Sequence, residues 1–260
     1  MASPFINTER LESFAIVSLN RPEKLNALSR EMILALSDIF TDLDHEPNLR
    51  AVILTGTGGT AFCAGTDIIE LAELDEVRSG ELSERRRALC NQIENCRVPV
   101  IGAINGIAAG GGCELALACH LRIASPHAQF SLPEAGPGIV PADGGTDRLA
   151  HEIGNERALE MLLTGKAVSA EEALRFGLIN RVIPAVELLA EAKGLAHEIA
   201  EMAPLAIRAC LEAVIQGSHL PLAEGLALET KLFASLFATE DVRESTSAFL
   251  EKRKPLFKGK

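Results

Sequence analysis

The chain has 260 residues, and 47% of them are hydrophobic, which is enough for a buried core without disulfide bonds. Its 25 basic and 36 acidic residues give a net charge of -11, which disfavours nucleic acid or an anionic membrane surface as the main partner. No segment reaches the roughly 18 apolar residues of a membrane span, and the N-terminus lacks the basic and then apolar pattern of a signal peptide. We therefore expect a soluble, cytoplasmic protein whose partner is a small molecule or another protein.

The spacing of cysteine and histidine argues against a metal site. The six cysteines lie mostly inside apolar stretches and form no CxxC pair, so we expect reduced, buried thiols. The six histidines show no HxxxH spacing, and no serine lies in a GxSxG turn. The sequence thus favours neither metal-assisted nor serine–histidine–aspartate chemistry.

The first half of the chain alternates between predicted strands and predicted helices. Short apolar runs predict strands, and apolar residues spaced near 3.6 predict amphipathic helices. In chain order these are a strand at 13–20, a helix at 30–43, a strand at 51–56, a helical stretch from 68 to about 96 and a strand at 99–105. A repeated strand–helix alternation of this kind is typical of the α/β fold class.

The second half begins with a helix that opens at Gly111 and becomes almost wholly helical from Glu156 onward. The expected strands cover 120–125 and 128–132, and the expected later helices cover 156–165, 169–177, 186–202, 204–216 and 222–250. No flexible or charged linker interrupts the chain. We therefore expect a core at 1–200 and a helical region at 201–260 that continues the same unit and makes subunit contacts.

The run GTGGTA at 56–61 has the GxGxxA form of a dinucleotide-binding turn and follows a predicted strand. That fingerprint needs a helix that starts within the glycines, whereas the following AFCAG at 61–65 looks irregular. The acids near the required spacing, Asp75 and Glu76, fall in a polar helical stretch. A flexible turn between two elements is therefore the better interpretation.

Three glycines precede a short apolar helix in NGIAAGGGCELALAC (105–119), and this helix carries Glu114 in its first turn. The free N–H groups of a helix N-terminus, aided by the helix dipole, can stabilise a developing negative charge, as in an oxyanion hole. The N–H of Gly111 is therefore a candidate donor. Glu114 has two interpretations at this stage: a catalytic carboxylate, or an acid that only complements the helix dipole.

A second carboxyl, that of Glu134, stands alone between apolar residues and a rigid loop in SLPEAGPGIVPADGGT (131–146). Such surroundings favour a raised pKa. Two carboxyls in different environments can divide the work of a base and an acid. Glu114 and Glu134 are therefore the candidate proton-transfer pair.

Several segments together resemble the enoyl-CoA hydratase/isomerase, or crotonase, superfamily. They are RPEKLNALS (21–29), AFCAGTDI (61–68), NGIAAGGGCELALAC (105–119), LPEAGPGIVPADGGTDRL (132–149), LTGKAVSAEEALRFGLINRV (163–182) and FATEDVRESTSAFLEKRKPLFKGK (237–260). The resemblance covers nearly the whole chain. It implies a spiral of ββα repeats, an acyl-coenzyme A substrate, no redox cofactor or metal, and homotrimers that pair into hexamers.

The family pattern, carried over to this sequence, places the thioester carbonyl oxygen between the backbone N–H groups of Thr66 and Gly111. It also gives Ala64 a backbone contact with coenzyme A. Ionised Glu114 would activate water for attack on C3 of a trans-2-enoyl thioester, and Glu134 in its acid form would deliver a proton to C2. The resemblance therefore implies an enoyl-CoA hydratase. A Δ3,Δ2-enoyl-CoA isomerase, in which Glu134 moves the proton, is the nearest alternative, and a non-catalytic binding protein is the most remote.

The resemblance also implies contacts with the nucleotide end of coenzyme A. Lys24 would face the phosphates and Ala27 the pantetheine or adenine end, although a lysine in a surface turn is often only solvated. Phe249 and Lys252 match positions that reach the coenzyme A bound to a neighbouring subunit.

Two positions depart from the family pattern. His120 replaces an aspartate often found after the cysteine of the GGGCE helix, and Asp143 stands in a loop that usually reads PGAGGT. Some relatives use an aspartate in this loop for isomerisation, but theirs follows the proline directly. We expect Asp143 to stabilise the turn before the next helix. A cyclic or branched acyl group stays open as the substrate.

Overall fold

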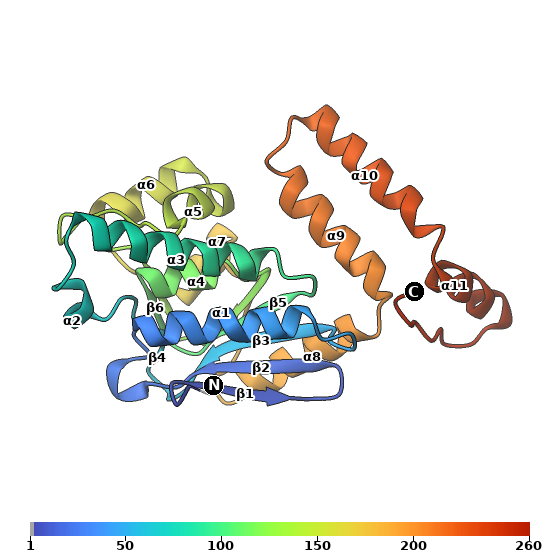
Figure 1. The fold of residues 1–260 in the computed structure, drawn as a ribbon, viewed down its shortest axis with the longest axis horizontal. Coiled ribbons are helices and arrows are strands. Elements are labelled where there is room, and N and C mark those ends of the chain that lie inside the picture. The colour runs from blue at the N-terminus through green and yellow to red at the C-terminus, as the bar shows by residue number, and fades with distance from the viewer. Residues whose placement is uncertain (1–2) are drawn as a thin grey trace.

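The computed structural model of the chain describes residues 3–260, and within that range the strands form two sheets (Figure 1). The six-stranded sheet contains, in spatial order, β1 (Ile6–Arg10), β2 (Phe14–Leu19), β3 (Ala51–Gly56), β5 (Val100–Ile104), β7 (Leu121–Ala124) and β10 (Arg181–Val182). The four-stranded sheet contains β4 (Ala61–Cys63), β6 (Ile107–Ala109), β8 (Gln129–Ser131) and β9 (Val168–Ser169).

Consecutive strands pass from the larger sheet to the smaller one, and a helix then returns the chain to the larger sheet. The strand pairs are β3 and β4, β5 and β6, and β7 and β8. The helices that follow them are α2 (Ile68–Leu71) and α3 (Glu76–Glu94), then α4 (Gly111–Leu117), then α5 (Gly145–Ile153), α6 (Asn155–Thr164) and α7 (Ala170–Phe176). Neighbouring strands of these repeats pair in parallel. The expected α/β spiral of ββα repeats is confirmed.

Strand β3 is buried on both of its faces, and this explains its unbroken apolar run. Val52 and Leu54 belong to the same core cluster as the buried stripe of α1 (Arg30–Asp44), whereas Ala51 and Ile53 pack in a second cluster with α8 (Leu188–Ala200). Helix α1 begins at an N-cap, Ser29, whose hydroxyl accepts a hydrogen bond from the Met32 N–H. The larger sheet is thus a rigid central layer between two helices.

The parallel strands β4, β6 and β8 all end at one edge of the smaller sheet. The segments that leave this edge begin at residues 64, 110 and 132. Because the carboxyl ends of parallel strands lie side by side, the fold brings together three segments that are far apart in the sequence.

The C-terminal helices form an arm that projects away from the sheets (Figure 1). Helices α9 (Pro204–Gly217) and α10 (Leu222–Leu236) pack against each other, and α11 (Glu240–Glu251) follows. Neither α9 nor α10 has a fully buried residue, although both are rich in apolar side chains. The division of the chain at residue 200 stays a prediction. Within residues 3–260, no helix is long and apolar enough to cross a membrane.

A cavity of about 790 Å³ lies between α9 and the core. Its lining includes Cys119 and His120 from the core and Cys210 and Val214 from α9. Five of the six cysteines are buried free thiols, as expected, whereas Cys210 is exposed.

The structure differs from the sequence-based expectation in where several elements begin and end. The helical stretch expected from residue 68 is divided, because Asp75 caps α3 by accepting a hydrogen bond from the Arg78 N–H at 2.8 Å. The helix expected at 222–250 is divided in the same way at Thr239, the N-cap of α11. The prediction that residues 61–65 have irregular structure was wrong in part, since residues 61–63 form β4.

Candidate active site

The predicted oxyanion-hole residues, Thr66 and Gly111, come from two of the three segments at the edge of the smaller sheet. The preceding residue of the first segment, Gly65, has φ of +96°, and a Cβ there would lie 2.7 Å from the Ala109 carbonyl oxygen and 3.4 Å from the Gly111 nitrogen. Only glycine permits so close an approach of the two backbones. The structure therefore brings the segments of Thr66 and Gly111 together.

Both backbone N–H groups lack an intramolecular acceptor among the described residues. Gly111 is the first residue of α4, where an N–H has no acceptor inside the helix. Neither Thr66 nor Gly111 donates through its N–H in the loop, cap or side-chain hydrogen bonds of residues 3–260. Two such donors side by side can stabilise an oxyanion.

Glu114 lies in the first turn of α4 and is 1% exposed. Its Oε1 atom accepts hydrogen bonds from the backbone N–H of Asp143, at 2.8 Å, and of Gly145, at 2.7 Å. A Cβ at Gly145 would lie 2.8 Å from the same oxygen, so this glycine gives the carboxyl room to reach the loop. The start of α5 thus fixes the orientation of the Glu114 carboxyl.

Glu134 lies in the loop that follows β8 and is half-buried. Its Oε1 atom lies against Gly110, where a Cβ would approach it to 2.8 Å, and its Oε2 atom is buried with no hydrogen-bond partner in the described part of the chain. Burial raises the pKa of Glu134, and the nearby Glu114 carboxyl raises it further, whereas Arg86 lowers it. The raised pKa predicted from its apolar surroundings agrees with the structure.

Arg86, which was not among the predicted site residues, lies in α3 and is 8% exposed. Its Nη2 atom lies 2.5 Å from Asp143 Oδ2 and 4.0 Å from Glu114 Oε2, and its Nη1 atom donates to the Thr66 hydroxyl. The sequence held a signal for this residue, because Arg86 shares the buried stripe of α3 with Leu89 and Ile93. A charged residue on an apolar stripe needs a buried partner.

The role expected for Asp143 was wrong. Helix α5 has Gly144 as its N-cap and no side-chain cap, whereas the Asp143 side chain is buried and pairs with Arg86. Burial raises the pKa of Asp143 to about 7, and Glu114 raises it as well, while Arg86 opposes both. A third carboxyl therefore belongs to the site.

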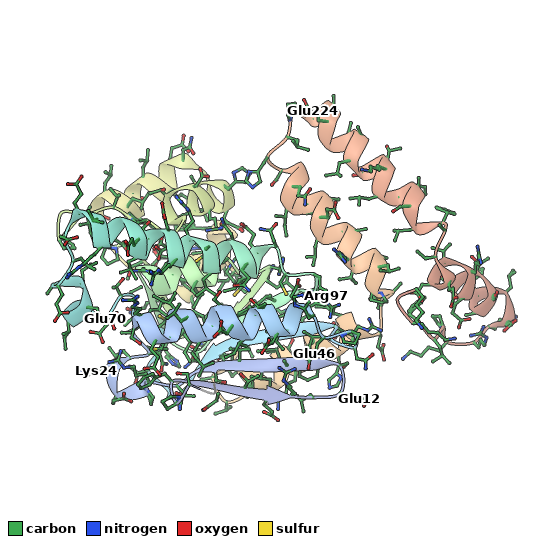
Figure 2. The ribbon with its side chains drawn as sticks, viewed as in Figure 1. Glu12, Lys24, Glu46, Glu70, Arg97 and Glu224 are labelled. Atoms are coloured by element: carbon green, nitrogen blue, oxygen red, sulfur yellow. The ribbon has the colours of Figure 1, made fainter. Side chains whose placement is uncertain are left out.

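Three of the predicted coenzyme A contacts lie in two segments that backbone hydrogen bonds hold side by side. Lys24 ends a short 3₁₀ helix, η1 (Pro22–Lys24), and is exposed. The Ala64 N–H donates to the Leu25 carbonyl at 3.0 Å, which ties this loop, including Ala27, to the segment that carries Thr66. Figure 2 shows Lys24 at the end of the molecule opposite the C-terminal arm.

Phe249 and Lys252 lie at the end of α11 in the arm (Figure 1). Phe249 is 83% exposed, and Lys252 is the C-cap of α11. The structure of one chain does not bring these two residues close to Lys24, which lies at the opposite end of the molecule (Figure 2). Their contact with coenzyme A on a neighbouring subunit stays a prediction.

His120 has a structural role in this fold. Its Nδ1 atom accepts a hydrogen bond from the Val100 N–H at 2.8 Å, so in the neutral ring Nε2 carries the proton and donates to the Glu94 carbonyl at 3.0 Å. Burial lowers the pKa of His120, which favours this neutral form. The residue connects the end of α3 to β5.

A two-sheet ββα spiral with a backbone N–H pair beside buried carboxyls defines an enzyme of the crotonase type. The chain belongs to the enoyl-CoA hydratase/isomerase family, whose model matches residues 9–260.

Curated relatives and solved structures agree with this assignment. The chain is 38% identical to the short-chain-enoyl-CoA hydratase of Clostridium acetobutylicum over 95% of this chain and 94% of the relative. It is also 38% identical to the crotonyl-CoA hydratase of Syntrophomonas wolfei over 99% of each chain. The crystal structure of an enoyl-CoA hydratase from Bacillus anthracis superposes with a TM-score of 0.96 at 40% identity, covering 98% of this chain and 100% of that one.

Proposed function

We propose that this protein is an enoyl-CoA hydratase, which adds water reversibly across the 2,3 double bond of an enoyl-CoA thioester to give a 3-hydroxyacyl-CoA. The observation that carries the proposal is the pair of carboxyls around one oxyanion hole. Glu114 belongs to the helix that Gly111 begins, and Glu134 lies against Gly110. The hydratase names of the relatives support the same reaction.

The site has a group for each step of the hydration. The carboxylate of Glu114 takes a proton from water as the water oxygen attacks C3, and the acid form of Glu134 gives a proton to C2. The negative charge that forms on the thioester oxygen is held by the N–H groups of Thr66 and Gly111. The reaction changes no net oxidation state, so it needs no redox cofactor. The N–H pair and the two carboxyls supply the charge stabilisation and proton transfer that a metal ion could otherwise provide, so we propose that no metal ion takes part.

The coenzyme A part of the substrate provides binding contacts away from the reacting carbons. We assign Lys24, Ala27 and Ala64 to its binding, because the loop of Lys24 and Ala27 is hydrogen-bonded to the segment that carries Ala64 and Thr66. The relatives named for short-chain and crotonyl substrates make crotonyl-CoA the first acyl thioester to test. A cyclic or branched acyl group is the second class.

The exposed apolar side chains of the C-terminal arm support an assembly of identical subunits, a trimer or a dimer of trimers. In that assembly Phe249 and Lys252 would reach the coenzyme A of a neighbour. The absence of any disulfide among the six free cysteines is consistent with a cytoplasmic location.

The function can be tested with purified protein and a panel of trans-2-enoyl-CoA and 3-enoyl-CoA thioesters in ¹⁸O-labelled water. A hydratase adds one labelled water to a 2-enoyl thioester, which mass spectrometry detects. Conversion of 3-enoyl to 2-enoyl thioesters without label would identify an isomerase instead. Retention of every thioester unchanged, with tight binding of one of them, would indicate a non-catalytic binding protein.

A further inference from the structure

Arg86 contacts three parts of the site that the chain supplies from distant positions. One guanidinium approaches Asp143 to 2.5 Å, lies 4.0 Å from Glu114 and donates to the Thr66 hydroxyl. The first contact is with the loop before α5, the second with α4, and the third with the segment after β4. The water-activating carboxyl and the oxyanion hole are thus connected through a single side chain.

The position of Arg86 is tightly restricted. A Cβ added to Gly111 would overlap Nη2 of Arg86, so the guanidinium lies directly against the first residue of α4. Its Nε atom is buried and has no hydrogen-bond partner in the described part of the chain. An arginine that leaves a buried donor unpaired gives up stability, which the terminal nitrogens must offset through their contacts with Asp143 and Thr66.

The positive charge of Arg86 lies beside two buried carboxyls. Glu114 and Asp143 lie close together and are almost fully buried, and two neighbouring carboxylates in a low-dielectric environment repel each other. The Arg86 cation beside both carboxyls opposes that repulsion. Without it, one carboxyl must take up a proton or turn away from the other.

Other charged groups face Glu114 but do not replace Arg86. Arg148 in α5 donates to the Asp143 carbonyl, but its charge is paired with Glu94 at 2.8 Å. Glu134 faces Glu114 from the loop after β8, and its raised pKa favours the neutral acid. Burial raises the pKa of the neighbouring thiols of Cys90 and Cys113, so they add no charge.

We propose that Arg86 is a positioning residue for hydration, which holds Glu114 and Asp143 together as one ionic cluster and joins that cluster to the Thr66 side of the oxyanion hole. This inference rests on the proposed function. Arg86 acts through Glu114 and does not itself take part in proton transfer.

The test compares Arg86→Met, Arg86→Lys, Asp143→Asn and the Arg86→Met/Asp143→Asn double variant. Arg86→Met should lower kcat by about 10²-fold, the loss typical of a misplaced catalytic group, with little change in KM. The acid side of its pH profile should move to higher pH, because the unpaired carboxyls hold protons more tightly. The double variant should recover about 10-fold relative to Arg86→Met, because only one carboxylate is left. Arg86→Lys should lie between Arg86→Met and the parent.

Arg85→Met is the matched control, since Arg85 is the preceding residue of α3 but is exposed. It should keep the parental kcat and pH profile. Three results would overturn the proposal: an unchanged pH profile in Arg86→Met, a loss that falls on KM alone, or a double variant no more active than the single one. A loss on KM would mean that Arg86 contacts the acyl chain instead.

A second measurement does not depend on turnover. The ¹³C resonance of the Asp143 carboxyl, assigned with Asp143→Asn, should titrate near pH 7 in the parent, because burial raises its pKa to about 7, and at higher pH in Arg86→Met. An inactive parent with this shift would reject the proposed function and keep the ionic cluster. An active parent in which Arg86→Met leaves the Asp143 titration unchanged would reject the cluster. If Arg86→Met fails to fold, Arg86→Gln, which also removes the charge but keeps a hydrogen-bond donor, takes its place, and an unchanged titration there would reject the cluster.

Discussion

Glu134 shows how a residue acquires an acid's function from its surroundings. The side chain lies against Gly110, with one oxygen buried and unpaired, and both burial and the Glu114 carboxyl raise its pKa. A carboxyl with a raised pKa keeps its proton to higher pH than an ordinary glutamic acid. The apolar surroundings of the loop after β8 therefore favour the protonated form of Glu134 that the proposed proton transfer to C2 needs.

Substitution of the two glutamates tests their division of labour. Glutamine keeps the size of glutamate but neither takes nor gives the proton, so Glu114→Gln and Glu134→Gln should each lower hydration by about 10²–10⁴-fold. The double variant should lose less than the product of the two factors, because either step alone blocks the reaction. A Glu114→Gln variant that still converts 3-enoyl thioesters at the parental rate would favour an isomerase.

The pH profile of the parent enzyme tests the raised pKa of Glu134. Hydration needs Glu134 in its acid form, so kcat should fall as the pH rises through the pKa of that carboxyl. This alkaline fall should occur above the pH expected for an ordinary glutamic acid. The residual activity of Glu134→Gln should show no such alkaline fall. A fall that persists in this variant would assign the titration to another group.

Residue types and spacing predicted part of this site. Gly111, Glu114 and Glu134 carry signals in their local sequence, since glycines at a helix start and isolated acids point to charge stabilisation and proton transfer. Thr66 needed the family resemblance. Arg86 was missed because its partners lie 28 residues away in α4 and 57 residues away in the loop before α5, a proximity that only the packed fold reveals.

At the scale of elements, the smaller sheet places the proposed oxyanion hole, and Gly65 lies at a close approach of two of its segments. Gly65→Ala would add a Cβ at 2.7 Å from the Ala109 carbonyl oxygen, at a φ of +96° that strains any L side chain. We expect a loss of about 1–3 kcal/mol in unfolding free energy and of about 10²-fold in kcat, measured by urea unfolding and by turnover.

Gly80 provides the control for this substitution. It lies in α3, where a Cβ would meet nothing within 4 Å. Gly80→Ala should raise stability by about 0.5–1 kcal/mol, because alanine favours the helix, and should leave kcat unchanged. Parental turnover in Gly65→Ala would show that the approach of the two backbones does not matter for the reaction.

The predicted elements were most accurate where the apolar pattern is long. Helix α1 and strands β2, β3 and β5 lie close to their expected positions, because each has a clear period or an unbroken apolar run. The strand β1, the short strands β6, β9 and β10 and the helix α5 were missed. Strand β1 is an edge strand with one buried residue, so it has no apolar pattern. Strands of two or three residues carry too little pattern, and α5 begins with glycines that read as a loop.

At the scale of the whole molecule, the arm has an apolar stripe that one chain leaves exposed. Leu222, Leu226 and Phe233 of α10 and its C-cap Phe237 recur at helical spacing, and the two phenylalanine rings contact each other with centroids 5.0 Å apart. Water-exposed apolar stripes of this kind are typical of subunit interfaces. The proposed trimer or hexamer would cover it.

Replacing both aromatic rings tests the assembly. A Phe233→Glu/Phe237→Glu variant should dissociate to a monomer, because two charges would have to be buried in the interface. Light scattering measures the mass, and circular dichroism checks that the fold persists. Val186→Glu is the matched control, since Val186 is 94% exposed but lies outside the arm, and it should keep the parental mass. An unchanged mass in the double variant would place the interface elsewhere.

The arm can be labelled selectively with a thiol reagent, because it carries the exposed cysteine, Cys210. Burial raises the pKa of Cys63 to about 12 and that of Cys96 to about 11, and a buried, protonated thiol reacts slowly with maleimides. Cys210 is exposed and lines the cavity between α9 and the core. A fluorescent probe can therefore be attached at one position of the wild-type chain, where its emission reports whether the arm is open to solvent or covered.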